Sequence, residues 1–206
     1  MTNHLEAEKV AEHRLEHVQL GEVRISVYDM AGELATMLRY GNEHAAKLVP
    51  VRVQSACAYG EVLGAADCDC KTQLDEAFKM FKDARCGILI YLNQEGRGAG
   101  LAVKARAYEL QDREQLDTVQ AYERLGVDVD QRRYDIAASI LRQLDLGKIK
   151  LLTNNERKIQ QLVNANVSLE RQPLTGAITR HNLSYLRVKR DKLGHMLDLQ
   201  SSVRPR

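Results

Sequence analysis

Cys86-Gly-Ile-Leu-Ile-Tyr-Leu92 is the stretch of this chain that decides its fold class. The run is apolar and rich in strand formers, long enough for a buried strand and too short for a helix. The polar loop Asn93–Gly100 follows it directly, and helical spacing of apolar residues resumes from Leu101 to Gln111. A buried strand that leads through a loop into a helix is typical of α/β layering. Within this strand, Cys86 is predicted to be a core residue.

Helix and strand patterns continue to alternate downstream. Helices are predicted over Thr118–Leu125 behind Asp117 as a cap, over Tyr134–Leu144 closed by Gly147, and from Asn154 as a cap to about Asn164. Strand character marks Lys148–Thr153 and the surroundings of Val167 and Leu169. Residues 184–198 are predicted to form the last helix.

The chain before Cys86 begins with strand patterns. Three strands are predicted, over residues 22–27, 34–40 and 49–54. We expect them to form an antiparallel meander that delivers Arg52 and Cys57 to one end of a sheet.

An amphipathic helix is predicted after these strands. Apolar residues recur at helical spacing from Leu74 to Phe81, behind the capping-box-like Thr72-Gln-Leu-Asp75. The positive end of its dipole, right behind Cys70, would help to hold thiolates or an anion. Taken with the alternation downstream, the predicted fold is α/β (α+β), a mixed β-sheet with flanking helices.

Composition narrows the class of protein. The chain has 206 residues, of which 44% are hydrophobic, enough for one domain with a sizeable core. The net charge of +2 is too small to predict a nucleic-acid partner, and no apolar stretch approaches the roughly 18 residues that a membrane span needs. No secretory pattern opens the chain, and clustered cysteines without export signals favour metal binding or catalysis over disulfides. We therefore expect a cytoplasmic protein with no nucleic-acid and no membrane partner.

Three regions are expected along the chain. Residues 1–20 form a polar N-terminal extension that could be helical or partly disordered, and its His4, His13 and His17 are predicted to be surface residues. Residues 21–198 form the main domain, and residues 199–206 form a basic C-terminal tail.

The cysteines carry the strongest chemical signal. Cys57, Cys68 and Cys70 lie at a C-x10-C-x-C spacing. Structural zinc takes four protein ligands, whereas catalytic zinc keeps three and an open position for water, so this stretch favours a catalytic zinc site. The alternatives are a structural site completed by His181 or His195, and a chance cluster of small buried residues.

Three further motifs are polar. In Gln94–Gly100, glycines let backbone amides approach an anion and Arg97 offers a guanidinium suited to phosphate, although the pattern fits neither the dinucleotide fingerprint nor the P-loop. Asp130-Gln-Arg132-Arg133-Tyr134 could hold phosphate or form a solvated turn, and Thr153–Lys158 could bind a ligand at a strand end or merely cap a helix. Together with the cysteines, these motifs suggest zinc-activated water beside a phosphate-binding surface, and therefore hydrolysis of a nucleotide.

With these segments assembled, the chain resembles the GTP cyclohydrolase II family from about residue 20 to about residue 198. The resemblance rests on segments that stand in the family's order and at nearly its spacing: Arg52-Val-Gln-Ser-Ala-Cys57, Asp67-Cys-Asp-Cys70 with Gln73, Gln94-Glu-Gly-Arg-Gly98, Lys104-Ala-Arg-Ala-Tyr-Glu-Leu-Gln-Asp112, Asp117-Thr-Val119, Leu125-Gly126, Asp130-Gln-Arg132, Leu151-Leu-Thr-Asn-Asn155, Tyr185-Leu and Lys192-Leu-Gly-His195.

The resemblance implies an enzyme that acts on GTP or a close purine nucleotide. Such an enzyme opens the imidazole ring, releases C8 as formate and loses pyrophosphate, leaving a diaminopyrimidinone ribosyl phosphate on the way to riboflavin. The resemblance also implies one Zn²⁺ per chain, Mg²⁺ on the triphosphate and a homodimer.

The resemblance assigns roles by position. Cys57, Cys68 and Cys70 hold the zinc ion that activates water for attack at C8. Tyr108 sits beside the reacting ring, Asp130 is the proton acceptor, and Arg132 takes the family's nucleophile role, although a guanidinium that stays protonated favours an electrostatic role. Substrate contacts are implied for Arg52, Val53, Gln54, Ser55, Ala56, Gln73, Glu95, Gly96, Arg97, Thr118, Thr153 and Lys158.

Several positions depart from the family pattern, and most are interpreted as facing the site: Gln54, Ala56, Asn93, Val103, Tyr122, Arg133 and Glu156. These departures leave three hypotheses. The first is a zinc-dependent GTP cyclohydrolase of the family type. The second is a divergent paralogue in a specialised pathway, which would give an N-formyl product or release only pyrophosphate. The third is a nucleotide-binding protein without turnover.

Overall fold

The computed structural model describes residues 6–199, and its core is a single mixed sheet. The spatial order of the strands is β1-β2-β3-β5-β4-β6-β7. The pairs β1–β2, β2–β3 and β3–β5 are antiparallel. The pairs β5–β4, β4–β6 and β6–β7 are parallel. The strand bounds are β1 Glu8–His17, β2 Gly21–Met30, β3 Glu33–Gly41, β4 Pro50–Ser55, β5 Cys86–Leu92, β6 Ile149–Leu152 and β7 Leu169–Gln172. The predicted mixed sheet with flanking helices is confirmed.

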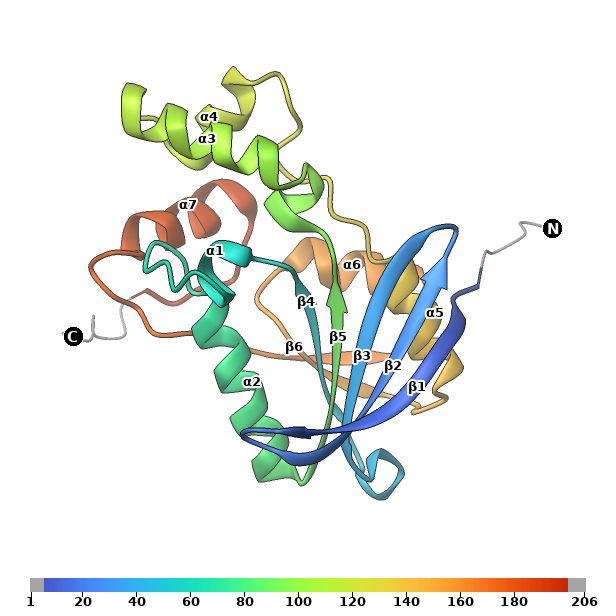
Figure 1. Cartoon of the computed structure of the whole chain (residues 1–206). Coiled ribbons are helices and arrows are strands. Elements are labelled where there is room, and N and C mark those ends of the chain that lie inside the picture. The colour runs from blue at the N-terminus through green and yellow to red at the C-terminus, as the bar shows by residue number, and fades with distance from the viewer. Residues whose placement is uncertain (1–5, 200–206) are drawn as a thin grey trace.

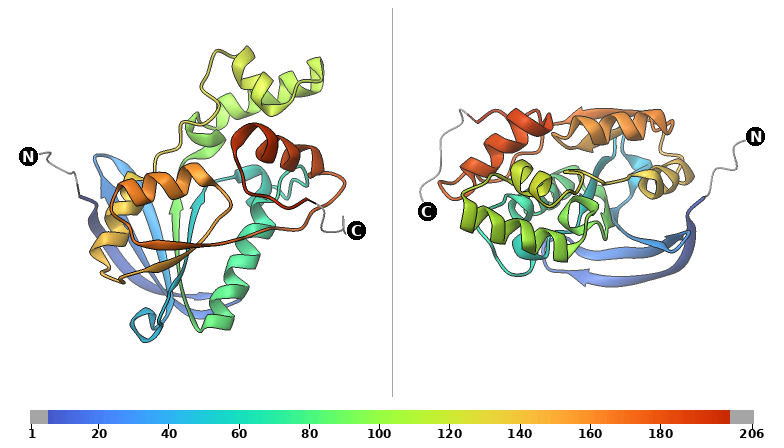
Figure 2. Two further views of the ribbon diagram at one scale, coloured as in Figure 1. Left: turned by 180° about the vertical axis from the view of Figure 1, so that it is seen from behind. Right: turned by 90° about the horizontal axis from the view of Figure 1, so that it is seen from above.

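Helices cover both faces of this sheet. Their bounds are α1 Ala58–Glu61, α2 Cys70–Ala84, α3 Leu101–Glu114, α4 Thr118–Arg124, α5 Asp135–Gln143, α6 Glu156–Asn164 and α7 Leu183–Leu193, with short 3-10 helices η1 Glu43–Ala45 and η2 Glu95–Gly98. One core layer packs α5 and α6 against strand residues such as Met37 and Ile90, and the other packs α2 against residues such as Ile25 and Leu89. The helices therefore form two layers around the sheet, with α2 on one side and α5 and α6 on the other (Figures 1 and 2).

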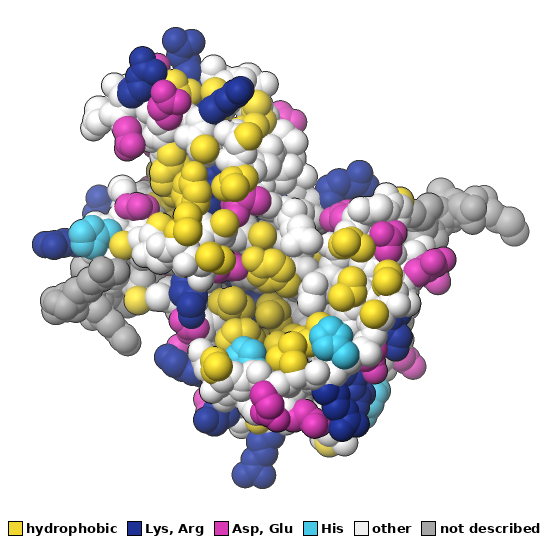
Figure 3. Space-filling view, viewed as in Figure 1, with side chains coloured by type: hydrophobic (Ala, Val, Ile, Leu, Met, Phe, Trp, Pro, Cys, Tyr) yellow, Lys and Arg dark blue, Asp and Glu magenta, His cyan; other side chains and the backbone are white. Residues whose placement is uncertain are grey.

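The apolar surface is not fully covered. Leu15 of β1 and Leu34 of β3 are 41% and 45% exposed. Figure 3 shows apolar side chains gathered along the middle of one face, beside strands β1 to β3. None of the helices in residues 6–199 is long and apolar enough to cross a membrane.

The parallel half of the sheet brings the chemical motifs together. Strands β4, β5 and β6 run in the same direction, so the chain leaves all three at the same edge. The loop after β4 carries Cys57, the loop after β5 carries η2, and the loop after β6 carries Thr153. This edge is where open α/β sheets bind ligands. Helices α3, α4 and α7 stand above it (Figure 1).

Two predictions about the N-terminal half are wrong. Residues 8–17 form β1 and not a helix, because β1 pairs along its length with β2; residues 1–5 lie outside the described part. The three predicted strands exist, but β4 does not extend the meander. Strand β5 lies between β3 and β4, so the meander consists of β1, β2 and β3.

Three helix ends also differ from the prediction. Helix α2 begins at Cys70 with Asp69 as its N-cap, so Thr72 and Asp75 form no capping box. Asn155, and not Asn154, caps α6, since its side chain accepts a hydrogen bond from the Lys158 amide. Helix α7 ends at Leu193 rather than continuing to residue 198. The predicted cap at Asp117 and the buried core position of Cys86 are confirmed.

Candidate active site

The three clustered cysteines meet at the start of α2. Their sulfur atoms all lie within 4.8 Å of one another, and Cys57 Sγ lies 3.8 Å from Cys68 Sγ. Gly60 makes room for them, because a Cβ at this position would lie 2.6 Å from Cys68 Sγ. Hydrogen bonds from the Cys68 and Cys70 thiols lower the pKa of Cys57, which favours a thiolate there.

This donor set fits zinc. Three soft sulfur donors with no fourth His, Cys, Asp or Glu ligand among residues 6–199 match a site that keeps one position open. The group does not include His181 or His195, so the alternative of a four-ligand structural site finds no support in the described residues. The dipole of α2 adds positive potential at Cys70, its first residue.

Lys104 is a buried cation beside this cluster. Its Nζ donates to Cys57 Sγ at 3.3 Å and to Glu95 Oε1 at 2.7 Å, and lies 4.5 Å from the centre of the Tyr59 ring. Burial opposes its charge, but Glu95 and Cys57 outweigh burial and raise the pKa of Lys104. Glu95 also accepts from the Ala58 amide at 2.6 Å. Lys104 and Glu95 therefore connect residues 57–70, the cysteine loop, to η2 and α3.

The glycine-rich loop aims Arg97 into the same pocket. Gly96 and Arg97 both have φ of 57°, a left-handed conformation that a non-glycine residue rarely adopts. A Cβ at Gly98 would lie 2.9 Å from the backbone of Gln131, so the loop packs tightly on the segment before α5. The Tyr122 hydroxyl donates to the Gly96 carbonyl at 3.0 Å and braces the loop.

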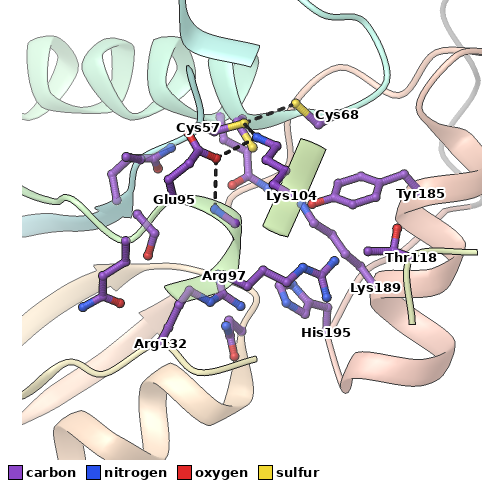
Figure 4. A pocket seen from close by; sticks show the side chains of 18 of the residues that line it. Cys57, Cys68, Glu95, Arg97, Lys104, Thr118, Arg132, Tyr185, Lys189 and His195 are labelled. Carbon is purple, nitrogen blue, oxygen red and sulfur yellow. Dashed lines mark hydrogen bonds and ion pairs between the residues drawn. The ribbon is translucent and has the colours of Figure 1, made fainter. Parts of the chain in front are cut away.

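Arg97 ends in two guanidinium nitrogens that are buried without a hydrogen-bond partner among the described residues. Buried polar groups of this kind are costly unless something pairs with them. The guanidinium lies 5.8 Å from the Tyr185 ring and points into the pocket (Figure 4). It is therefore ready to bind an anionic ligand.

Asp130 and Arg132 form a partly buried ion pair. Arg132 donates through Nε and one terminal nitrogen to the two Asp130 oxygens, at 2.8 and 2.7 Å. Burial would raise the pKa of Asp130, but this pairing outweighs burial and holds the pKa below its usual value. Arg132 lines the pocket and Asp130 does not.

The polar atoms of Arg52 and Gln54 are engaged in hydrogen bonds within the protein. Arg52 donates to Gln54 Oε1, to Gln73 Oε1 and to the Leu152 carbonyl, at 2.6–2.9 Å. Gln54 in turn donates to Glu61 at 2.7 Å. Both side chains reach the pocket wall, but their polar atoms brace the loop after β4.

Thr153 lies in the loop after β6, and Lys158 lies in the first turn of α6. Lys158 Nζ donates to the Val53 carbonyl, and its side chain is almost completely buried. Burial, together with the charges of Arg52 and Arg132, lowers the pKa of Lys158 well below its usual value. An anion in the pocket would relieve this crowding of cations.

The pocket unites most of the predicted site residues, but not all. Those that line it are Arg52, Gln54, Ser55, Ala56, Cys57, Cys68, Cys70, Gln73, Glu95, Gly96, Arg97, Tyr108, Thr118, Arg132, Thr153 and Lys158. Val53 and Asp130 do not line it. Among the departures from the family pattern, Gln54, Ala56 and Tyr122 line the pocket, whereas Asn93, Arg133 and Glu156 are exposed outside it and Val103 packs in the α3–α4 core. The interpretation that most departures face the site is therefore wrong.

Several pocket residues are not among the predicted site residues: Gln94, Lys104, Ala107, Gln111, Tyr122, Asn154, Asn155, Tyr185, Lys189 and His195. The last three come from α7 and the loop after it. Of these, His195 was considered only as a fourth ligand of a structural zinc site. Lys189 Nζ donates to Asp69 Oδ1 at 2.6 Å, and both side chains are at most 10% exposed. Lys104 and Tyr185 stood inside segments that resemble the family, which is the signal that could have identified them.

Comparisons with known proteins point to one family. The family model described as GTP cyclohydrolase II matches residues 8–173. A GTP cyclohydrolase-2 from Shewanella amazonensis is 41% identical over 167 residues, which cover 81% of this chain and 81% of that protein. A riboflavin biosynthesis protein RibBA from Chlamydia trachomatis is 40% identical over 195 residues, covering 93% of this chain and 46% of that protein. This chain thus spans less than half the length of several relatives that it matches.

Proposed function

This chain belongs to the GTP cyclohydrolase II family, and on that premise we propose that it hydrolyses GTP. The proposed reaction opens the imidazole ring, releases C8 as formate and releases pyrophosphate. The observation that carries the proposal is that one pocket joins a three-sulfur metal site to the unpaired guanidinium of Arg97. A nucleotide would suit this pocket, because its base could be hydrolysed at the metal site while its phosphates bind Arg97.

Cys57, Cys68 and Cys70 would hold zinc at the ring end. Bound there, zinc would supply a Lewis acid that makes water nucleophilic near neutral pH. Tyr108 packs edge-on against Tyr59, with ring centres 5.3 Å apart, and forms the wall on which the guanine ring would lie. Gln73 and Thr118 line the same pocket and would contact the base and ribose.

Arg97, Arg132 and Lys158 would bind the phosphates at the other end. Arg132 acts as a fixed positive charge, since a guanidinium stays protonated at any pH of interest. Asp130 supports this role by holding Arg132 through two hydrogen bonds. Mg²⁺ would neutralise much of the remaining triphosphate charge.

The alternative outcome, in a divergent paralogue, has specific support. Gln54, Ala56 and Tyr122 line the pocket at positions where the family resemblance expects other residues. A changed wall could stop the reaction at an N-formyl product or after pyrophosphate release. A homodimer stays a proposal from the resemblance, and a cytoplasmic location without nucleic-acid or membrane partners stays a proposal from composition and sequence pattern.

One assay distinguishes these outcomes. Purified protein is incubated with GTP, Mg²⁺ and zinc, and formate, pyrophosphate and the ultraviolet spectrum are followed. Formate together with pyrophosphate supports the proposed reaction. Pyrophosphate without formate, or an N-formyl product, supports the paralogue. Unchanged GTP that nevertheless binds supports a binding protein without turnover.

The variant Cys68→Ser tests the metal site itself. It should lose zinc and ring opening, because two sulfurs cannot hold the ion as three do. Cys86→Ala is the matched control: Cys86 is a buried cysteine in β5 outside the pocket, so the variant should keep full zinc content. Ring opening by zinc-free Cys68→Ser would refute the proposed role of the cluster.

A further inference from the structure

The loop after α7 presents His195 to the pocket. The backbone of this loop is well anchored: the His195 amide donates to the Lys189 carbonyl at 3.0 Å, and residue 195 forms a β-bridge with Asn155. The next amide, of Met196, donates to the Asn154 carbonyl at 2.9 Å. Because the backbone holds the loop, the half-buried imidazole is left to face the cavity.

Four cations from different elements share the pocket with this imidazole. Lys189 comes from α7, Arg132 from the loop before α5, Arg97 from η2 and Lys158 from α6. Arg171 lies behind the loop and donates to the Met196 carbonyl. Figure 4 shows His195 beside Arg97 and Lys189 in the pocket. Burial and these charges together lower the pKa of His195 to about 2, so the ring is neutral at physiological pH.

A neutral imidazole can accept a proton where the protonated arginines around it cannot. The arginine and lysine side chains around His195 can donate hydrogen bonds but cannot accept them while they are charged. Asp130 is the nearest carboxylate to Arg132, but its oxygens already accept from Arg132 and it does not line the pocket. His195 is therefore the pocket group at the cationic end whose ring nitrogen is available to water or to a bound ligand.

We propose that His195 is a catalytic proton acceptor at the phosphate end of the pocket. The inference rests on the proposed function. As water attacks the α-phosphorus of the bound triphosphate, an O–P bond forms, the bond from the α-phosphorus to the bridging oxygen breaks, and pyrophosphate leaves. The proton released by the water passes to the His195 imidazole. The negative charge of the triphosphate offsets the surrounding cations and thereby makes the imidazole basic enough to receive it.

The first test measures protonation without turnover. Zinc-loaded protein with ¹⁵N-labelled histidine is titrated from pH 8 to pH 5 by NMR, with and without inorganic tripolyphosphate and Mg²⁺. The chain has six histidines, so the signal of His195 is assigned by its loss in His195→Gln. We expect a neutral ring throughout in the free protein and a titration within this range in the complex. A ring that titrates near its ordinary pKa in the free protein, or that ignores tripolyphosphate, overturns the proposal.

The second test is kinetic. His195→Gln should lower kcat for pyrophosphate release by about 10²–10⁴-fold, the usual contribution of a general base, with KM changed only a few-fold. Added imidazole should restore part of the rate. His181→Gln is the control, because His181 is exposed and outside the pocket. A His195→Gln enzyme with unchanged kcat and an unchanged pH profile overturns the proposal.

The two tests separate this inference from the proposed function. If the wild-type protein releases neither formate nor pyrophosphate, the proposed function fails. The NMR titration then still decides whether a bound triphosphate makes the His195 ring basic, with tripolyphosphate-dependent protonation in favour of this property and constant neutrality against it.

Discussion

At the scale of single residues, Lys104 is the least expected part of the site. It lies in the first turn of α3, where the helix dipole disfavours a positive charge. It is also buried, which costs a lysine several kcal/mol unless it is paired. Its partners are Glu95 and a cysteine sulfur, so we infer that its charge offsets the negative charge of the three thiolates.

Lys104→Met should therefore weaken zinc binding by about 10- to 100-fold, the usual effect of removing a group that supports a metal ligand. Competition with a chromophoric chelator measures the affinity. Lys71→Met is the matched control, because Lys71 neighbours Cys70 but its ion pair with Asp75 is partly exposed. Equal zinc affinities in the two variants would contradict the inferred role of Lys104.

Single residues also mark how far the sequence could predict the site. Cys57, Cys68 and Cys70 were found because metal ligands from one short segment leave a spacing that can be recognised. Lys189 was not found, because its partner Asp69 is 120 positions away and no local pattern encodes such a contact. The role of Asp130 behind Arg132 likewise depends on which side chain reaches the cavity, which spacing does not reveal.

At the scale of elements, α7 joins three parts of the pocket. Lys189 pairs with Asp69 in the cysteine loop, and Lys192 pairs with Asp117 at the start of α4. Tyr185 lies between the cations of Arg97 and Lys189, with its ring centre 5.8 and 4.5 Å away. Helix α7 lies beyond residues 8–173, which the family model matches, yet it forms a wall of the site.

Lys189→Met should loosen α7 and destabilise the protein by about 3–5 kcal/mol, because it leaves the buried Asp69 carboxylate without its cation. Lys192→Met should cost no more than about 1 kcal/mol, since its ion pair is partly exposed. Urea unfolding gives the free energies, and hydrogen exchange of residues 183–193 reports the helix. Similar exchange in both variants would refute the anchoring role of Lys189.

Strand order shows why elements are easier to predict than their arrangement. Every strand from β2 to β7 could be predicted, because buried strands leave an alternating or continuous run of apolar residues in the sequence. Strand β1 was missed because its side chains are nearly all exposed, so it carries no apolar stripe. The place of β4 was missed although α2 connects it to β5, and a strand–helix–strand unit favours parallel pairing.

At the scale of the whole molecule, pH should act through groups that the fold holds away from their usual charge state. His195 has a folded pKa of about 2, against 6.5 for an ordinary histidine. Below pH 6.5 the unfolded chain binds a proton at this position that the folded chain does not, so acid favours unfolding. Asp130 acts in the same direction, but only below its ordinary pKa of 3.8, because its folded pKa is lowered from that value.

The two groups therefore predict separate windows of acid destabilisation. His195→Gln removes only the upper window, so between pH 6.5 and pH 5 the wild-type protein should lose up to about 1.4 kcal/mol per pH unit relative to the variant. Acid release of zinc affects both proteins alike and cancels in this difference. Urea unfolding at pH 7.5, 6 and 5 measures it. Parallel loss of stability in the two proteins would show that the folded chain binds the same proton, and that the cation cluster does not keep His195 neutral.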